Sequence, residues 1–250
     1  MKTHKRLLRV WSLLMGILLC GGILSGCIPA DASQPNEEDI ELIQLEPPKE
    51  GQDIAIFETN WGTIKMMLFP EETPQTVAHF KTLIESGFYD GRAIAKVDQT
   101  TRTIYTGIDE TTDTHGRVMT EDGKDVPIEI SPNLWHFSGA VSAYQNVTGF
   151  NSKYTNSDSR FFIVGTKEPF DQTEFQLEEQ EFPKVVRDAY KEHGGLLEYS
   201  SCFTVFAQVY EGLDVVDDII DHVKLKEDSV EPAEELYIIK ATLSTYSSEN

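Results

Sequence analysis

Short runs of alternating apolar and polar residues recur along the chain from residue 53 onward. Two of them, at 54–59 and 63–69, flank the turn sequence Asn60-Trp61-Gly62, and this arrangement predicts a β-hairpin. Similar runs, rich in β-branched and aromatic residues, predict further strands at 93–97, 139–144, 160–165, 203–210 and 236–246. The chain is therefore expected to be mainly β.

A different period follows the hairpin and predicts a helix over 74–86. Thr73 is a good N-cap residue, Pro74 suits the first helical position, and Gly87 suits the position just after the last turn. Between them, apolar residues recur at helical spacing, namely Val77, Phe80, Leu83 and Ile84. One face of this helix should be buried.

Helical spacing appears in two more places. A second helix is predicted over 213–222, and a short amphipathic helix is predicted between Pro183 and the glycines that follow position 193. Many short strands with only two core helices favour a closed antiparallel barrel over a parallel α/β sheet. Closure also removes exposed strand edges, which would invite aggregation.

The first 26 residues have the layout of a secretory signal. Basic residues precede an apolar stretch at 10–19, and small residues follow it. The sequence Leu24-Ser25-Gly26-Cys27 resembles a bacterial lipobox, in which the cysteine is lipidated and becomes the new first residue. Residues 1–26 are thus interpreted as a lipoprotein signal peptide, with an ordinary signal peptide or an uncleaved anchor helix as alternatives. The lipobox interpretation places the protein on the extracytoplasmic face of a bacterial cytoplasmic membrane, anchored by lipid.

Residues 27–52 are predicted to be a lipidated, flexible tether. The segment is rich in Pro, Glu, Asp and Gln and contains few aromatic residues. Such a composition buries too little apolar surface to offset the entropy of ordering. The folded domain is accordingly expected to begin near Asp53 and to extend to residue 250.

Charge and cysteine content narrow the possible functions. The formal net charge of −21 argues against a nucleic-acid partner, because phosphate binding requires clustered basic residues. Of the three cysteines, Cys20 lies in the signal and Cys27 would carry lipid, so Cys202 is the one thiol left and no intrachain disulfide is predicted. The histidines are scattered without paired-ligand spacing, so neither a metal site nor another cofactor is predicted.

Several segments, in order, resemble the framework of a cyclophilin-type peptidyl-prolyl isomerase. They are Glu58-Thr59-Asn60-Trp61-Gly62-Thr63-Ile64-Lys65, Thr73-Pro74 with Val77 and Phe80, Gly87-Phe88-Tyr89-Asp90-Gly91, Ser159-Arg160-Phe161-Phe162-Ile163 and the run 204–216. The resemblance implies a closed eight-stranded antiparallel barrel with two capping helices. It also implies one inserted helix, within an insertion at about 167–201 similar to that of exported bacterial members.

The resemblance implies catalysis of rotation about X–Pro bonds. That rotation is slow because it breaks amide resonance at a cost of about 18–20 kcal/mol. A catalyst needs an apolar pocket for the proline ring, hydrogen bonds to the neighbouring backbone, and a donor that reaches the proline nitrogen as its lone pair localises. A planar, forked guanidinium suits the last task.

The positions where the family carries these groups have changed in this sequence. Lys96 stands at the arginine position and keeps the charge without the fork. Phe162 matches the pocket phenylalanine, and Arg160 replaces a glutamine. The remaining positions at which substrate contacts are implied hold Tyr105, Tyr144 and Phe203, with Glu198 or Leu197 where some members have an aromatic residue.

Together these changes predict that isomerase activity on secreted or surface proteins is weak or lost, with Lys96 as the surviving charge. The alternative is a surface lipoprotein that binds a proline-containing peptide or an unfolded exported protein without catalysis. A third reading is a structural lipoprotein with no groove, in which the matching residues serve folding alone. Arg102, Arg160 and Lys96 could also form a basic spot that receives a peptide carboxylate.

Overall fold

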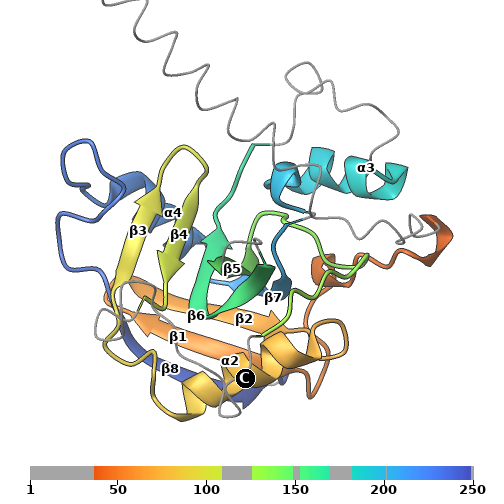
Figure 1. Ribbon diagram of the computed structural model, residues 1–250, viewed down its shortest axis with the longest axis horizontal. Helices are drawn as coiled ribbons and strands as arrows, with labels where there is room; N and C mark the ends of the chain where they lie inside the picture. Colours follow the sequence, from red (N-terminus) through yellow and green to blue (C-terminus); the bar gives the residue numbers. More distant parts are fainter. Residues whose placement is uncertain (1–36, 109–125, 149–152, 169–181, 201, 249–250) are drawn as a thin grey trace, which may run out of the picture. The chain divides into compact units, whose positions relative to one another are not determined.

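The computed structural model describes residues 37–108, 126–148, 153–168, 182–200 and 202–248. Within them eight strands form one antiparallel sheet (Figure 1). The strands are β1 (Asp53–Thr59), β2 (Gly62–Leu68), β3 (Ile94–Asp98), β4 (Thr103–Thr106), β5 (Ala140–Thr148), β6 (Lys153–Val164), β7 (Val205–Glu211) and β8 (Ile238–Thr245). Strand β4 was not among the runs predicted from the pattern, because it has only four residues and two of them are threonines.

The sheet curls until its two edge strands meet. The strand order is β3-β4-β6-β5-β7-β2-β1-β8, and the edges β3 and β8 are joined by the bridge between Ala93 and Tyr237. Backbone hydrogen bonds from Ile94 to Leu236 (2.9 Å) and from Gly91 to Ile238 (2.8 Å) continue this seam. The predicted eight-stranded, mainly β barrel is confirmed, with a closure that is much shorter than its other strand pairings.

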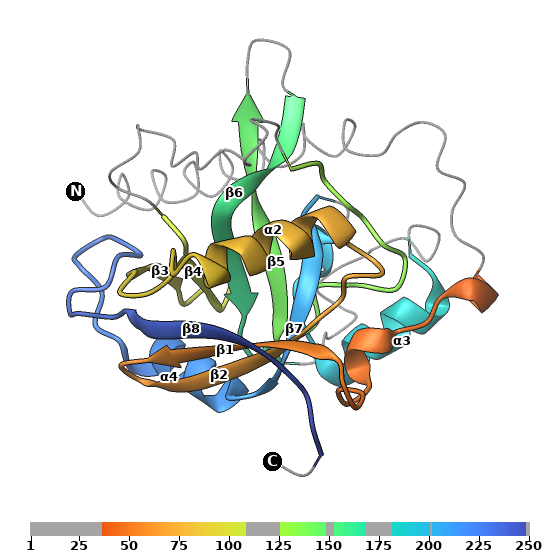
Figure 2. The ribbon, with the colours of Figure 1, turned by 90° about the horizontal axis from the view of Figure 1, so that it is seen from below.

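All three predicted helices are present within one or two residues of the expected bounds. They are α2 (Pro74–Glu85), α3 (Lys184–His193) and α4 (Leu213–His222). Helix α2 packs against β6 and β8, whereas α4 packs against β2, β3 and β4, and both helices bury apolar side chains in the barrel interior, from different ends of the barrel (Figures 1 and 2). Gly87 ends α2 with a φ of 72°, the left-handed conformation that glycine adopts readily.

The N-terminus of α2 is capped differently from the prediction. Thr73 makes no capping hydrogen bond, and its hydroxyl donates to the Phe69 carbonyl instead. The cap is the carboxylate of Glu129, which accepts from the backbone N–H groups of Gln75 (3.2 Å) and Thr76 (2.8 Å). A negative charge at this position also suits the helix dipole. Sequence spacing could not reveal a cap that comes from more than 50 residues away.

The barrel interior is filled by apolar side chains from the strands and from both core helices. Phe57, Phe80, Tyr89, Phe161 and Phe206 form its aromatic centre, with ring centroids 4.9–6.2 Å apart. The Tyr89 hydroxyl donates to the Ser159 carbonyl, so the polar end of this buried ring is satisfied. Four of these residues, Phe80, Tyr89, Phe161 and Phe206, belong to the framework segments that the sequence matched.

The predicted tether is too long, because its second half packs on the domain. We call Glu37–Leu45 the N-terminal strap; it contains the short 3₁₀ turns η1 (Glu37–Asp39) and η2 (Ile43–Leu45). Ile40 and Gln44 of the strap are buried, and the strap lies beside α3 in both ribbon views. The prediction rested on the polar composition of the whole segment 27–52, which does not reveal the few apolar residues that anchor the strap. Cys27 and the predicted signal peptide lie outside the described residues. Within the described part of the chain, none of the helices combines the length and apolar character needed to span a bilayer.

Candidate active site

The predicted site residues gather on the outer face of β3, β4, β6 and β5. Lys96 of β3 lies opposite Tyr105 of β4, and Tyr105 lies opposite Phe162 of β6. Phe162 in turn lies opposite Ser142 of β5. Since neighbouring strands are about 4.8 Å apart, the Cα atoms of Lys96 and Phe162 are roughly 10 Å apart across two strands. The register thus confirms that Tyr105 stands between the two.

The ring of Phe162 is covered completely and has an exposed fraction of 0%. Four rings surround it, with centroid distances of 5.5 Å to Tyr105, 6.0 Å to His136, 5.8 Å to Tyr199 and 5.4 Å to Phe203. His136 stacks nearly parallel to Phe162, whereas Tyr199 and Phe203 meet it edge-on. We call these five residues the aromatic cluster. A proline ring has no surface of Phe162 to contact while the cluster holds this arrangement.

His136 forms the back of the cluster and is fully buried. Its Nε2 lies 2.8 Å from the Ser142 hydroxyl, which donates its own hydrogen to the Thr204 carbonyl at 3.0 Å. Nε2 must therefore carry the proton, and the buried Nδ1 has no hydrogen-bond partner among the described residues. Burial lowers the pKa of His136 to about 3, so its ring is neutral at physiological pH.

The outer rim of the cluster is a half-exposed set of rings with a cation beside it. Tyr144 lies 6.0 Å from Tyr105 and 6.3 Å from Phe203. The guanidinium of Arg160 stands 4.9 Å from the centre of the Tyr144 ring, within the range of a cation–π interaction. Burial raises the pKa of Tyr105 and of Tyr199, so both hydroxyls remain protonated at neutral pH. The rim offers stacking surfaces and phenol groups instead of a deep pocket.

Lys96 is exposed at the edge of this face. Its nearest recorded electrostatic influence is on Glu231, whose pKa is lowered chiefly by the hydrogen bond from Lys226 and more weakly by the charge of Lys96. The segment that carries Glu231 covers the edge of β3, since the Val97 N–H donates to the Val230 carbonyl. The ammonium therefore stands at the solvent-exposed edge of the face, beside the segment that covers β3.

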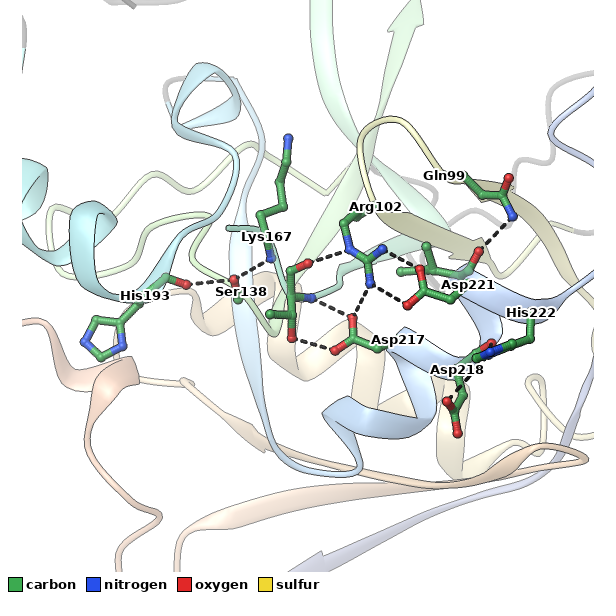
Figure 3. Close-up of polar contacts among 11 residues, drawn as sticks. Gln99, Arg102, Ser138, Lys167, His193, Asp217, Asp218, Asp221 and His222 are labelled. Carbon is green, nitrogen blue, oxygen red and sulfur yellow. Dashed lines mark hydrogen bonds and ion pairs between the residues drawn. The ribbon is translucent and has the colours of Figure 1, made fainter. Parts of the chain in front are cut away.

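Arg102 does not belong to this face, so the predicted three-residue basic spot is wrong in that member. Figure 3 shows its guanidinium directed at α4, where it pairs with Asp217 (2.9 Å) and Asp221 (2.5 Å). It also donates to the Thr166 carbonyl. These partners use most of its donors and tie the β3–β4 turn to α4. The sequence could not foresee this, because the aspartates lie over 110 residues away.

Two members of the aromatic cluster, Tyr199 and His136, were not predicted from the sequence. Tyr199 ends the 3₁₀ turn η3 (Leu197–Tyr199) and lies in the cluster, whereas Glu198 beside it is exposed and Leu197 is buried in a separate cluster with residues of α3. His136 lies in a segment without clear periodicity, and nothing in its neighbours signalled its position. Among the described residues, no group of three or more His, Cys, Asp or Glu side chains could hold a metal ion.

Comparison with known proteins agrees with this fold. The family model for "Cyclophilin type peptidyl-prolyl cis-trans isomerase/CLD" matches residues 54–243. A Staphylococcus aureus (strain USA300) protein that carries the name of a peptidyl-prolyl cis-trans isomerase is 31% identical over 171 residues, which cover 68% of this chain and 82% of that protein. The chain belongs to the cyclophilin-type peptidyl-prolyl cis-trans isomerase family.

More distant relatives support the same assignment. A Streptococcus pyogenes (serotype M6) protein named as a bifunctional phosphatase/peptidyl-prolyl cis-trans isomerase is 29% identical over 177 residues, covering 70% of this chain and 35% of that protein. Two crystal structures of a Cryptosporidium parvum cyclophilin have TM-scores of 0.56. One is 20% identical and covers 79% of this chain and 98% of its own. The other, determined in the presence of the dipeptide Ala-Pro, is 19% identical and covers 78% and 99%. At this identity they show the shared fold.

Proposed function

We propose that this cyclophilin-type domain binds extended, proline-containing segments of exported proteins and rotates their X–Pro bonds slowly or not at all. The observation that carries the proposal is the complete burial of Phe162 by its four aromatic neighbours. Isomerisation needs a pocket that holds the proline ring and a donor at the proline nitrogen. Here the Phe162 ring, which would contact the proline, is covered by other side chains. The half-exposed rings of Tyr105, Tyr144 and Phe203 remain as contact surfaces for a peptide.

Lys96 supports the same conclusion about turnover. An ammonium is a compact, strongly hydrated charge, whereas a guanidinium presents a fixed plane of donors. The ammonium would therefore favour the twisted amide less than an arginine would. Binding without rotation is the alternative within this proposal, and it differs only in whether any residual rate is measurable.

A proline-isomerisation assay on the full-length chain in detergent tests both parts. We expect rates near the uncatalysed value for the wild type and for Lys96→Arg, because the covered pocket limits both. The double variant Lys96→Arg with Phe203→Ala should exceed both single variants, since removing the Phe203 ring opens one side of Phe162. Tyr210→Ala is the matched control, because this half-buried ring packs against Tyr246 instead of Phe162.

Two outcomes would contradict the proposal. Wild-type rates far above background would show that the cluster opens easily, and would refute the weak-turnover part. A labelled Ala-Pro-containing peptide that binds neither the wild type nor the Phe203→Ala variant would refute peptide binding. The second result would favour a structural surface protein without a groove.

We also propose that the protein is anchored by lipid on Cys27 at the extracytoplasmic face of a bacterial cytoplasmic membrane. The support is the sequence alone, with its basic residues, apolar stretch and Leu24-Ser25-Gly26-Cys27. Metabolic labelling with a radioactive fatty acid should modify the wild type and leave the Cys27→Ser variant unlabelled. Equal labelling of both would refute the anchor.

A further inference from the structure

Gln44 of the N-terminal strap is a buried polar residue outside the family-matched range 54–243, with an exposed fraction of 2%. Its side-chain nitrogen donates to the Trp135 carbonyl (2.8 Å) and to Oε1 of Gln208 (2.9 Å). Its side-chain oxygen accepts from the Trp135 N–H. A buried amide that satisfies both backbone groups of one residue fixes that residue's position.

The residue held in this way stands next to His136. Gln208, the partner of Gln44, donates to the Ser138 carbonyl at 2.8 Å. The segment 135–138 is therefore held at both ends by one pair of glutamines. Between these ends, His136 projects to the aromatic cluster and stacks on Phe162. The strap is thus connected to the back of the aromatic cluster through the side chains of Gln44 and Gln208 and the backbone of the segment 135–138.

The far side of the same segment is held by the chain that carries Tyr199. The His136 carbonyl accepts from the Leu196 N–H at 2.8 Å, and the Leu196 carbonyl accepts from the Tyr199 N–H at 3.0 Å. A shift of the segment would consequently move His136 and Tyr199 together. The strap itself is anchored on α3, where the Val185 N–H donates to the Glu37 carboxylate.

We propose that Gln44 is a positioning residue for the peptide groove, which it sets by holding the Trp135 peptide so that His136 backs Phe162. The strap is then part of the binding site, although it lies outside the family match. This inference rests on the proposed function for its effect on peptide binding. Its effect on His136 does not depend on that function.

The test compares Gln44→Met, which keeps the length and removes the hydrogen bonds, with Gln52→Met as a matched control. Gln52 also donates to a backbone carbonyl, that of Leu68, but has no recorded contact with the segment 135–138. One readout is hydrogen–deuterium exchange at the His136 ring C2–H, measured by mass spectrometry against pH on the full-length chain. The other is the affinity for a labelled Ala-Pro-containing peptide.

We expect Gln44→Met to speed His136 exchange and to move its midpoint up from about pH 3 towards the ordinary value, while Gln52→Met leaves both unchanged. Peptide affinity should fall by about three- to tenfold, the size of one or two net hydrogen bonds. Unchanged His136 exchange in Gln44→Met would overturn the inference. If that variant does not fold, Gln44→Asn, a shorter amide that reaches less of the Trp135 backbone and adds no charge, should show the same shift.

Failure of the proposed function would look different. If the wild type binds no peptide, the affinity readout is lost, but the exchange of His136 still decides whether Gln44 positions it. If peptide affinity falls equally in Gln44→Met and Gln52→Met with His136 exchange unchanged, loss of overall stability is responsible and the inference is wrong.

Discussion

Phe161 and Phe162 are neighbours on β6 and are both buried, yet they belong to different environments. Phe161 points into the barrel, where it packs against Phe57, Phe80, Tyr89 and Phe206. Phe162 points outward, and it is buried only because the segments that carry His136, Tyr199 and Phe203 cover it. The inner face is closed by the strands and core helices, whereas the outer face is covered by the segments that connect them.

This difference explains which parts of the family pattern have persisted. Inner residues touch many elements at once, so a change there disturbs the whole barrel. Outer residues are constrained by the ligand and by the covering segments, which can change together. The outer face can thus be filled by a ring such as that of Phe203 while the barrel retains its family character.

The sharpest test of this comparison is to truncate each phenylalanine. Phe161→Ala should cost about 3–5 kcal/mol of unfolding free energy, the usual result of a large cavity in a core. Phe162→Ala should cost clearly less, because the half-exposed rings around it can move into the space. Urea unfolding measures both, with Phe161→Leu and Phe162→Leu as milder controls. Equal costs for the two alanine variants would remove the distinction between the faces.

Acid should weaken the outer face selectively through His136. Its folded pKa of about 3 lies below the ordinary 6.5, so between these values the unfolded chain binds more protons. The stability from the neutral ring is complete above pH 6.5 and is lost as the pH falls, by roughly 3 kcal/mol at pH 4. The free energy of unfolding should therefore fall less between pH 7 and pH 4 in His136→Gln than in the wild type. An equal fall in the two proteins would contradict the lowered pKa of His136.

Removing the distant cap of α2 should have an intermediate effect. Glu129→Ala leaves the N–H groups of Gln75 and Thr76 without their acceptor, which should cost about 1–2 kcal/mol. Glu129→Gln keeps an acceptor without the charge and should cost less. Because this cap serves the inner face, peptide affinity should hardly change in a binding assay. A large loss of affinity in the folded Glu129→Gln variant would show that the faces are coupled here.

The smallest effect is expected at Arg102. Replacement by lysine keeps the charge but loses the forked contact with Asp217 and Asp221, and partial exposure limits the cost to about 1 kcal/mol or less. Thermal unfolding should detect this change, and peptide affinity should remain at the wild-type value. Arg102 is directed at α4, away from the aromatic cluster. A loss of peptide affinity larger than the loss of stability explains would show that Arg102 takes part in peptide binding.

Several features of the protein followed from the sequence alone. The alternation of apolar residues predicted seven of the eight strands, and the helical spacing predicted α2, α3 and α4. Local patterns suffice for these elements because their burial repeats with the period of the backbone. The strand register then brings Lys96, Tyr105 and Phe162 into line on three neighbouring strands.

Other features depended on contacts between distant segments. The strap was predicted to be part of a flexible tether, because its few apolar residues and Gln44 become buried only through contacts with α3 and Trp135. Glu129, His136 and Tyr199 acquired their roles from irregular segments, whose conformation no periodicity encodes. The sequence allowed Arg102 a place in a basic spot, but its aspartate partners on α4 hold it elsewhere. Local sequence determines which faces can be buried, but only the tertiary structure decides what covers them, because the covering groups come from elsewhere in the chain.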